Sequence, residues 1–520
     1  MSLANLAPHH DVIVIGGGIT GAGIAREAAA AGLDTLLVEQ RDYAWGTSSR
    51  SSKMVHGGLR YLAGGHLGLA RNAVRERQRL LAQVPGLVDR MRYVMPHYRK
   101  GFPCPRLFQK VLWLYDLLAG EHHRQRIDPI EMLQWLPGLS TDGLKAASGF
   151  SDAVTDDARL VLRVLDEARA LGAVTRNYTR AVRVTKPDDA PWSVTIADNA
   201  GESTLSASLV VNATGAWAED LWREGHGREH IRPLRGSHLL LPFERLPVSV
   251  SLTLPHPDDK RPVFMFPWLG RTVVGTTDLD HDDDLAQEPR ITQPEIAYLF
   301  RAIERAFPAA RITRDDILST WAGVRPVVTR NNRRSPSAES REHVIWDEGG
   351  LISVAGGKLT TFRSIARDVL LIGSPRFREL VLQDEDAPIF RPPPSMERPR
   401  SIPHLTWRRL QGHYGPSLGN VLAAGPLEEV PGTCYLWAEL HWTARQESVV
   451  HLDDLLLRRT RLGLILPDGA RALLSVLRQR LSADLGWSDD HWQAEIERYL
   501  HLWRTSYYLP GERETAWPSP

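Results

Sequence analysis

The stretch DVIVIGGGITGAGIAREAAAAGLDTLLVE, residues 11–39, decides the fold of this chain. A short apolar run at 12–15 indicates a buried parallel strand, and it leads directly into a glycine-rich turn. An alanine-rich segment at 22–31 predicts a helix that Gly32 ends, and a second apolar strand follows at 35–38. Strand, glycine turn, helix and strand in this order are typical of a dinucleotide-binding unit.

Gly16, Gly18, Gly21 and Glu39 give this unit its predicted chemistry. Gly16 and Gly18 allow the backbone to turn tightly and to approach a pyrophosphate, while Gly21 lets the helix pack closely on the strand. The positive N-terminus of the helix then faces the anion. Glu39, 18 residues beyond Gly21, is placed to accept hydrogen bonds from an adenosine ribose. The alternative, a glycine turn that arises by chance, does not account for this order and spacing.

The composition limits the classes of protein to consider. A length of 520 residues predicts two or three domains, and 42% hydrophobic with 24% charged residues is ordinary for a globular protein. A formal net charge of +1 gives no support to nucleic-acid binding. Cys104 and Cys434 are the only cysteines, and no signal peptide precedes the first apolar run. We therefore expect a cytoplasmic protein without a disulfide framework or a metal site, and without an apolar run of about 18 residues we expect no membrane span.

A serine-rich loop, TSSRSSKMVHGGLRYL at 47–62, follows the second predicted strand. A Rossmann site for NAD usually continues with alternating helices and strands, and this loop interrupts that series. Clustered hydroxyls and backbone amides suit a second surface that faces phosphate, as the extended cofactor FAD requires. A solvated loop without a ligand is the alternative. The sequence thus favours FAD, held noncovalently.

Several separated motifs carry a resemblance to a known family. Besides the loop at 47–62, they are SDAVTDDARLVL (151–162), VVNATGAWAEDL (210–221), RGSHLLLP (235–242), VGTTD (274–278), GVRPV (323–327), VAGGKLTTFR (354–363) and DDLLLRRTRLGL (453–464). In this order they resemble the FAD-dependent glycerol-3-phosphate dehydrogenases of the D-amino-acid-oxidase-like flavoprotein fold. Arg50 and Met54 depart from the family pattern, and residues 331–340, NNRRSPSAES, do not align with it.

The resemblance implies an α/β fold, α+β overall. A Rossmann-like FAD-binding domain joins an antiparallel-sheet substrate domain and a C-terminal α-helical cap domain. The FAD-binding domain is expected to be discontinuous, over residues 1–75, 151–229 and 321–385. The substrate domain is expected at 76–150 and 230–320, where strand-like runs indicate an antiparallel sheet. A proline-rich linker at 386–403 precedes a helical domain at 404–510.

Residues that match the family's motifs become candidate site residues. The cofactor-binding set comprises Gly16, Gly18, Gly21, Glu39, Thr47, Ser48, Ser51, Ser52, Lys53, Val182, Ala213, Thr214, Gly215, Gly357, Lys358, Leu359 and Thr360. A second glycine turn, Gly356-Gly357, precedes a predicted helix near Leu359, and the resemblance implies that it faces the carbonyl edge of the flavin ring. A purely structural glycine turn is the alternative there. No metal is expected.

The substrate that the resemblance implies, sn-glycerol 3-phosphate, carries a phosphate dianion and a secondary alcohol. Arginine forks chelate phosphate oxygens, and the positions that match the family are Arg60, Tyr61, Arg325, Arg341 and Lys358. Any one of these arginines could instead be a surface residue or part of a structural ion pair. His56 is the candidate base for the hydroxyl proton, and Arg325 could stabilise the developing alkoxide. A His56 that only holds the loop is the alternative.

The reaction implied by the resemblance is oxidation to dihydroxyacetone phosphate by hydride transfer to flavin N5, with electrons passed to a membrane quinone. A soluble oxidase that reduces oxygen to peroxide is the nearest alternative, and a flavin-binding scaffold without turnover is a third. The run PRLFQKVLWLYDLL at 105–118 predicts an amphipathic helix whose face of Leu107, Val111, Leu114 and Leu118 could lie on lipid at the inner face of the cell membrane. A helix packed on the protein's own core is the alternative. We also expect a homodimer, although the sequence does not itself give the oligomeric state.

Overall fold

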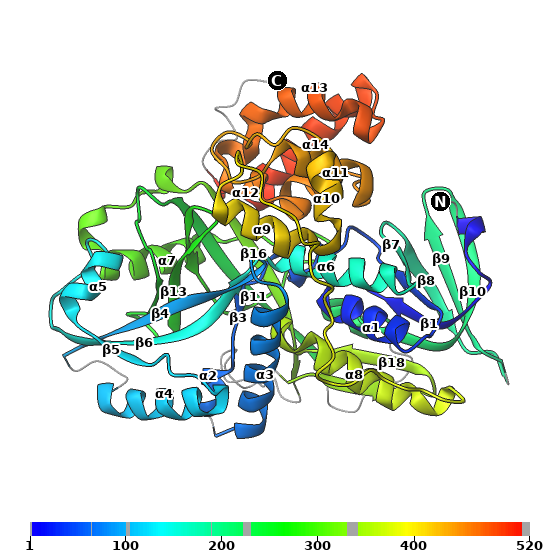
Figure 1. The fold of residues 1–520 in the computed structure, drawn as a ribbon, viewed down its shortest axis with the longest axis horizontal. Helices are drawn as coiled ribbons and strands as arrows, with labels where there is room; N and C mark the ends of the chain where they lie inside the picture. Colours follow the sequence, from blue (N-terminus) through cyan, green and yellow to red (C-terminus); the bar gives the residue numbers. More distant parts are fainter. Residues whose placement is uncertain are drawn as a thin grey trace.

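The computed structural model describes residues 3–63, 65–99, 104–188, 190–221, 230–329 and 342–511. Within these ranges the strands form two sheets, and a cap of helices covers them (Figure 1). The first sheet, at the right of Figure 1, combines the N-terminal strand with strands from the middle of the chain. The α/β fold with a C-terminal helical domain that the sequence predicts is confirmed.

The first sheet is built around parallel strands. Its main path is β17–β18–β10–β1–β2–β7 (Val344–Asp347, Leu351–Ala355, Gly201–Asn212, His9–Ile15, Thr35–Val38 and Val174–Arg176). β1 pairs in parallel with β2 and β10, and β18 pairs in parallel with β10. β8 (Arg180–Thr185) and β9 (Trp192–Asp198) form an antiparallel ribbon that continues from β10. The strand predicted at 35–38 is confirmed.

Helices cover one face of this sheet because successive side chains of a strand point to opposite sides. They are α1, α6 and α8 (Ile19–Ala30, Asp157–Ala170 and Phe362–Gly373). Val12 and Val14 of β1 share a core with these helices, whereas Ile13 and Ile15 share a core with the β8–β9 ribbon. α1 begins at Ile19, before the predicted start at residue 22, so its first turn lies directly beyond the end of β1.

The second sheet is mostly antiparallel. Its main path is β15–β11–β14–β13–β12–β4–β6–β3 (Leu279–Asp280, His230–Pro242, Arg271–Gly275, Pro262–Trp268, Ser251–Pro255, Val88–Tyr98, Leu144–Thr155 and Met54–Val55). β16 (Ser319–Thr329) pairs with β11, and β5 (Gln125–Ile127) pairs with β6. β4 and β12 form a parallel pair. β3 and β16 belong to this sheet, although the predicted domain limits assign most of their residues to the FAD-binding domain, and those limits stay a prediction.

Further helices surround the second sheet. They are α2, α3, α4, α5 and α7 (Leu59–Ala63, Leu67–Gln83, Pro105–Ala119, Pro129–Trp135 and Gln293–Ala306). α2 and α4 lie along the lower edge of the molecule in Figure 1, next to α3. None of the helices in the described ranges combines the length and the apolar character that a bilayer crossing needs.

α4 buries part of the face that was predicted to lie on lipid. The α4 side chains that share a core with α2 and α3 are Val111, Leu114, Tyr115 and Leu118. The large apolar side chains that α4 leaves exposed are Leu107, Trp113 and Leu117. Of the predicted lipid face, Leu107 is exposed, whereas Val111, Leu114 and Leu118 are partly buried against α2 and α3.

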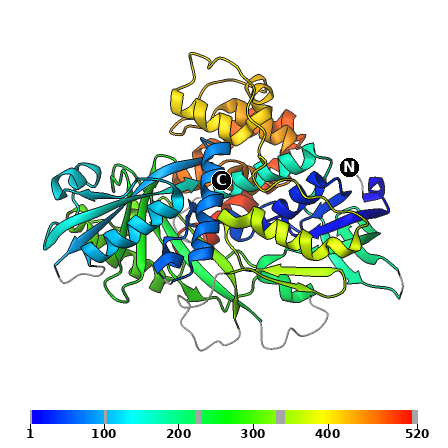
Figure 2. The ribbon, with the colours of Figure 1, turned by 60° about the horizontal axis from the view of Figure 1, so that its bottom comes forward.

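Helices dominate the described chain from residue 404 onward, as predicted. They are α9, α10, α11, a π-helix, α12, α13 and α14 (His404–Tyr414, Leu418–Ala423, Trp437–Gln446, Asp454–Arg459, Leu462–Ile465, Leu474–Leu485 and Asp489–Ser506). This cap sits above the junction of the two sheets (Figure 2). Arg461 forms buried ion pairs with Asp156 and Asp157 at the start of α6, and a shared core joins the cap to Trp268 and Trp321 of the second sheet.

Candidate active site

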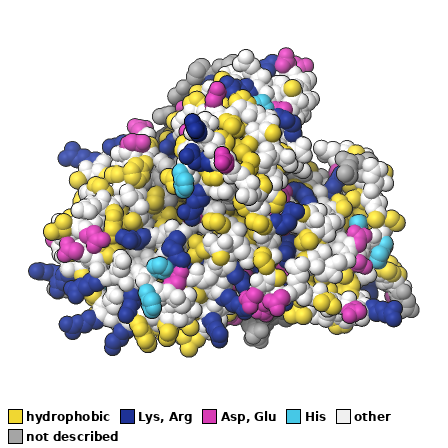
Figure 3. Space-filling model, viewed as in Figure 1, with side chains coloured by type: hydrophobic (Ala, Val, Ile, Leu, Met, Phe, Trp, Pro, Cys, Tyr) yellow, Lys and Arg dark blue, Asp and Glu magenta, His cyan; other side chains and the backbone are white. Residues whose placement is uncertain are grey.

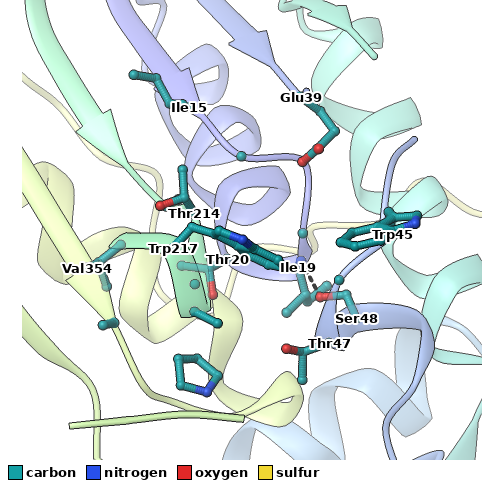
Figure 4. Close-up of a pocket in the computed structure, with 18 of the residues that line it drawn as sticks. Ile15, Ile19, Thr20, Glu39, Trp45, Thr47, Ser48, Thr214, Trp217 and Val354 are labelled. Atoms are coloured by element: carbon teal, nitrogen blue, oxygen red, sulfur yellow. Dashed lines mark hydrogen bonds between the residues drawn. The ribbon is translucent and has the colours of Figure 1, made fainter. Parts of the chain in front are cut away.

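A pocket opens where the parallel strands of the first sheet end (Figure 4). Its walls come from the turns after β1, β2, β10 and β18, from the serine-rich loop and from β8. The carboxyl ends of parallel strands are where α/β sheets bind their ligands. The predicted cofactor-binding residues that line the pocket are Gly16, Gly18, Glu39, Thr47, Ser48, Ser51, Val182, Ala213, Thr214, Gly215, Gly357, Lys358 and Leu359.

The backbone itself requires the glycines of the turn after β1. Gly16 has a φ of +116°, and a Cβ at this position would lie 2.5 Å from the carbonyl oxygen of Ala213. A Cβ at Gly21 would lie 1.9 Å from the carbonyl oxygen of Gly16, so α1 packs directly on the turn. Gly21 thus shapes the pocket from behind and does not line it. Such a bare turn leaves space for a pyrophosphate beside the backbone, and the residues present fit FAD.

Two side chains fix the backbone around the start of α1. Ile19 N donates a hydrogen bond to Ser48 Oγ at 3.0 Å, as drawn in Figure 4. Glu39 accepts hydrogen bonds from Gly17 N at 2.7 Å and from Arg41 N at 2.8 Å. Loss of bulk water raises the pKa of the Glu39 carboxyl above its ordinary value, against the effect of these two bonds. Glu39 therefore lies in the pocket wall at the end of β2, the position predicted to face a ribose.

Lys53 lies outside the pocket lining, although the sequence predicts that it binds the cofactor. Its Nζ is buried and lies 2.8 Å from Oδ1 of Asp157, at the start of α6. Burial lowers the pKa of the Lys53 ammonium to about 8, despite this carboxylate. Ser51 donates to the same carboxylate from its backbone N at 2.9 Å and from its Oγ at 2.7 Å. Asp157 thus anchors the serine-rich loop, with Lys53 on the side away from the pocket.

Ser52 and Thr360 also lie outside the pocket lining. Ser52 Oγ is 2.9 Å from Nε2 of His238, whose ring stacks on Trp321 with centroids 4.9 Å apart. Burial, and then the positive charge of Arg325, hold the pKa of His238 well below its usual range. His238 is therefore a neutral, weakly basic partner that holds Ser52.

Two of the predicted substrate-binding residues meet directly. Lys358 Nζ lies 3.7 Å from the centroid of the Tyr61 ring, within the range of a cation–π contact. Arg325, on β16, has its Nη1 2.8 Å from Oδ1 of Asp278, and 23% of its side chain stays exposed. Its neighbour Pro326 lines the pocket. Arg325 thus combines a carboxylate partner with access to solvent near the cofactor pocket.

The second glycine turn carries Lys358 to the pocket. Gly356 and Gly357 have φ values of +79° and +82°, conformations that a side chain strains. The turn follows β18 and leads into a 3-10 turn over Leu359–Thr361, ahead of α8. The side chain of Arg60 and the whole of Arg341 lie outside the described part of the chain, so their roles stay predictions.

His56 has a partner that sequence reasoning missed. Its Nδ1 lies 3.3 Å from Oδ2 of Asp152, on β6, and the imidazole is 38% exposed. A carboxylate behind a partly exposed imidazole is an arrangement that suits a general base. The sequence did offer a signal for this partner: Asp152 is an acidic residue inside a strand-like run. A charge buried in a sheet needs a partner, so a basic side chain could have been sought for it.

Trp45 and Trp217 also line the pocket without having been predicted (Figure 4). Their ring centroids are 5.8 Å apart, and the rings are tilted by 46°. Trp217 follows the predicted segment at 213–215 by two residues, and this proximity was the signal that could have found it. The two rings add aromatic side chains to a lining that also contains glycine backbone, hydroxyl groups, aliphatic side chains and charged side chains.

Comparisons with known proteins agree with this geometry. A family model described as FAD dependent oxidoreductase matches residues 11–363, and one described as the C-terminal domain of alpha-glycerophosphate oxidase matches residues 362–492. The chain is 32% identical to a glycerol-3-phosphate dehydrogenase of Mycobacterium leprae, over 94% of this chain and 87% of that protein. It is 31% identical to an aerobic glycerol-3-phosphate dehydrogenase of Staphylococcus aureus, over 87% of this chain and 86% of that protein. The crystal structure of a glycerol-3-phosphate dehydrogenase from Bacillus halodurans complexed with FAD matches with a TM-score of 0.76 and 27% identity, over 95% of each chain.

The fold, the glycine-lined pocket and the first family model define the class of FAD-dependent oxidoreductases, and FAD is the cofactor of this class. Relatives more than 30% identical match most of their own length and most of this chain. The chain therefore belongs to the FAD-dependent glycerol-3-phosphate dehydrogenase family. The resemblance stated from the sequence, the fold class and the cofactor are thus confirmed.

Proposed function

We propose that this chain oxidises sn-glycerol 3-phosphate to dihydroxyacetone phosphate and passes the electrons from noncovalently held FAD to a membrane quinone. The observation that carries the substrate half of the proposal is the placement of two cations beside the cofactor pocket. Lys358 lines the pocket and Arg325 immediately precedes a residue that does. The names of the relatives support the same substrate.

The phosphate is bound by the cationic side chains. The guanidinium of Arg325 offers a planar fork to phosphate oxygens, and the ammonium of Lys358, held over the Tyr61 ring, offers a point charge. Asp278 holds Arg325 at 2.8 Å, which keeps the guanidinium in place before the substrate arrives. A phosphate dianion gains charge-assisted contacts with these cations that a neutral polyol does not make.

The alcohol is activated at C2, the carbon next to the one that carries the phosphate. FAD, when bound, supplies the acceptor for the hydride that leaves C2. His56 accepts the hydroxyl proton on Nε2, the ring nitrogen that does not face Asp152. Arg325 stabilises the negative charge that develops on the C2 oxygen. Proton and hydride leave the same alcohol, so the product is the ketone.

α4 brings the protein to the quinone at the inner face of the cell membrane. Leu107, Trp113 and Leu117 are 57%, 51% and 61% exposed, and Arg106 and Lys110 are exposed beside them. Along the lower edge of Figure 3, where Figure 1 shows α4, hydrophobic side chains lie among Lys and Arg side chains. An apolar strip flanked by cations suits the surface of an anionic bilayer, with the apolar groups below the headgroups.

The experiment that tests the function is anaerobic bleaching of the flavin. We expect sn-glycerol 3-phosphate to bleach it rapidly, whereas glycerol does so only at far higher concentration. Arg325→Ala should lower the efficiency of bleaching by about 30- to 1000-fold with FAD content unchanged, because a charge-assisted phosphate contact is lost. Arg325→Lys keeps a positive charge opposite Asp278 without the fork and should recover only part of the loss. Equal efficiency on glycerol and its phosphate would rule out the proposed anion site.

Oxygen is the second candidate acceptor. It is favoured by the family model for the C-terminal domain, whose description names an oxidase. The same anaerobic experiment separates the two acceptors when the reduced enzyme is mixed with either a soluble quinone or oxygenated buffer. Faster reoxidation by the quinone supports the dehydrogenase. Rapid reoxidation by oxygen with stoichiometric peroxide shows the oxidase.

A further inference from the structure

In the described part of the chain, the imidazole of His56 has one hydrogen-bonding partner, Asp152. Its Nδ1 lies 3.3 Å from Oδ2 of Asp152, and no hydrogen bond reaches Nε2 from the part of the chain that the structure describes. The rings of Tyr93 and Phe264 flank the imidazole at centroid distances of 6.1 and 5.9 Å, which limits how far the ring can swing. The geometry thus distinguishes the two nitrogens, one turned to a carboxylate and the other left available.

Asp152 is itself fixed by three donors from three different segments. Its Oδ1 accepts hydrogen bonds from Gly57 N at 2.9 Å, Arg77 Nη1 at 2.7 Å and Tyr115 OH at 2.9 Å. Gly57 adjoins His56, Arg77 lies on α3 and Tyr115 lies on α4. Oδ1 is therefore saturated, and only Oδ2 faces the imidazole. A Cβ at Gly57 would lie 2.1 Å from Tyr115 OH, so this position has no space for a side chain.

We propose that Asp152 is a positioning residue for the reaction: it holds the His56 proton on Nδ1 and thereby presents the Nε2 lone pair to the substrate hydroxyl. The inference rests on the proposed function, in which His56 accepts the proton. The tautomer follows from the contact, because a carboxylate accepts a hydrogen bond and the nitrogen beside it must then donate one. When Nε2 takes the hydroxyl proton, the same carboxylate stabilises the imidazolium that forms.

The charge of Asp152 supports this role. Burial alone would raise the pKa of its carboxyl, but the hydrogen bond with His56 and the charge of Arg77 outweigh burial and hold the pKa below its usual range. The carboxylate is therefore ionised throughout the range in which an imidazole titrates. The titratable or charged groups around His56 in the described structure include Asp152 on β6, Arg77 on α3, Tyr93 on β4 and Tyr115 on α4.

Asp152→Asn tests the proposal, because an amide keeps the shape and removes the charge. We expect the rate of anaerobic flavin reduction by sn-glycerol 3-phosphate to fall about 100- to 1000-fold, with KM and FAD content close to those of the wild type. Asp152→Glu keeps a carboxylate beside the imidazole and should restore part of the rate, which a loss of shape alone would not predict.

Control variants show whether Asp152 acts on the reaction through His56 or only supports the fold. Glu121→Gln removes the other carboxylate at Arg77, which lies 2.9 Å from Nη2, and should leave the rate of flavin reduction close to that of the wild type. The double variant Asp152→Asn with His56→Asn should be no slower than His56→Asn alone, because the two residues act as a unit. An Asp152→Asn enzyme with a wild-type rate overturns the proposal while the function of His56 stands. A His56→Asn enzyme with a wild-type rate overturns the proposed function of His56 and this inference with it.

Asp152→Asn leaves Arg77 with one carboxylate fewer, and loss of FAD in this variant would indicate a folding defect. In that case the variant Tyr115→Phe distinguishes a positioning role of Asp152 from a role in folding only. It removes one hydrogen bond to Oδ1 without exposing a buried charge, and it should slow flavin reduction about 3- to 10-fold with FAD retained. If Tyr115→Phe reduces its flavin at the wild-type rate while Asp152→Asn fails to hold FAD, Asp152 is a partner of Arg77 in folding only, and the proposal is wrong.

Discussion

A side chain at position 16 would have to occupy the space between the end of β1 and the carbonyl group of Ala213. Its Cβ would lie 2.5 Å from that carbonyl oxygen, which leaves no room for it, and the φ of +116° would strain any residue other than glycine. The same backbone lines the pocket in which we expect FAD to bind. A methyl group at this position would therefore disturb both the predicted pyrophosphate site and the pairing of β1 with β10.

We expect Gly16→Val to yield protein without flavin. The side chain would displace either the backbone of β10 or the pyrophosphate, so the purified protein should be colourless, which absorbance near the flavin bands measures. Gly68→Ala is the matched control, because a Cβ at Gly68 meets nothing within 4 Å and its φ is ordinary for a helix. It should stay yellow. A yellow Gly16→Val protein would show that the turn does not bind the cofactor.

Single residues were predictable from the sequence where their neighbours in the chain define their role. Gly16 and Glu39 follow strands whose apolar pattern marks them, and both line the pocket. Lys53 and His56 have partners 104 and 96 residues away, Asp157 and Asp152. No local pattern specifies such pairs, so the sequence assigned Lys53 to the cofactor and left the carboxylate behind His56 unidentified.

At the scale of single elements, α4 has a buried face that contacts Asp152 and an exposed face with large apolar side chains. Its inner face places Tyr115 OH 2.9 Å from Asp152, while its outer face exposes Leu107, Trp113 and Leu117. A period of 3.6 residues predicted that the segment is an amphipathic helix. The same period could not tell which part of a wide apolar stripe is buried, since this depends on where α2 and α3 pack.

We expect the wild-type protein to sediment with anionic liposomes at low salt, and Trp113→Asp to sediment at least about tenfold less well. Loss of one large apolar side chain from the lipid surface and gain of a repelled charge both weaken binding. FAD content and flavin reduction in solution should stay unchanged, because Trp113 is 51% exposed. Leu405→Asp is the control, since Leu405 is 79% exposed on α9, in the C-terminal domain. Equal sedimentation of both variants would show that α4 does not bind lipid.

At the scale of the whole molecule, the C-terminal helices are joined to the serine-rich loop by buried charges. Arg461 lies 2.7 Å from Asp156 and 2.6 Å from Asp157, and Asp157 in turn binds Ser51 and Lys53. The strands at 12–15 and 35–38 and helicity at the C-terminus were predictable from local patterns. This junction was not, because the motifs at 151–162 and 453–464 gave no indication that they meet.

Arg461→Met should loosen this junction by about 3–5 kcal/mol, because two buried carboxylates lose their guanidinium. We expect a lower urea midpoint for flavin release, followed by fluorescence. Arg478→Met, which removes an exposed pair with Asp489 in the same domain, should change the midpoint little.

The effect of Arg461→Met should also depend on pH. The positive charge of Arg461 outweighs burial and holds the pKa of Asp156 below its usual range. A depressed pKa adds stability that is fully present above the unfolded value of about 4 and is lost as the pH falls toward the lower folded pKa. The difference between wild type and Arg461→Met should therefore shrink as the pH falls below about 4. A difference that does not change with pH would show that the ion pair is not its source.

The contacts of Asp157 join parts of the chain that the ribosome makes at very different times. Its carboxylate is shared between the loop that begins at residue 47 and a residue 304 positions further along the chain. At about 5–20 residues per second, a ribosome needs roughly 15–60 s to add that length after Asp157 is synthesised. During this interval the serine-rich loop and Asp157 are present but Arg461 is not, so the ion pair that joins Asp157 to the C-terminal helices can form only after Arg461 has been synthesised.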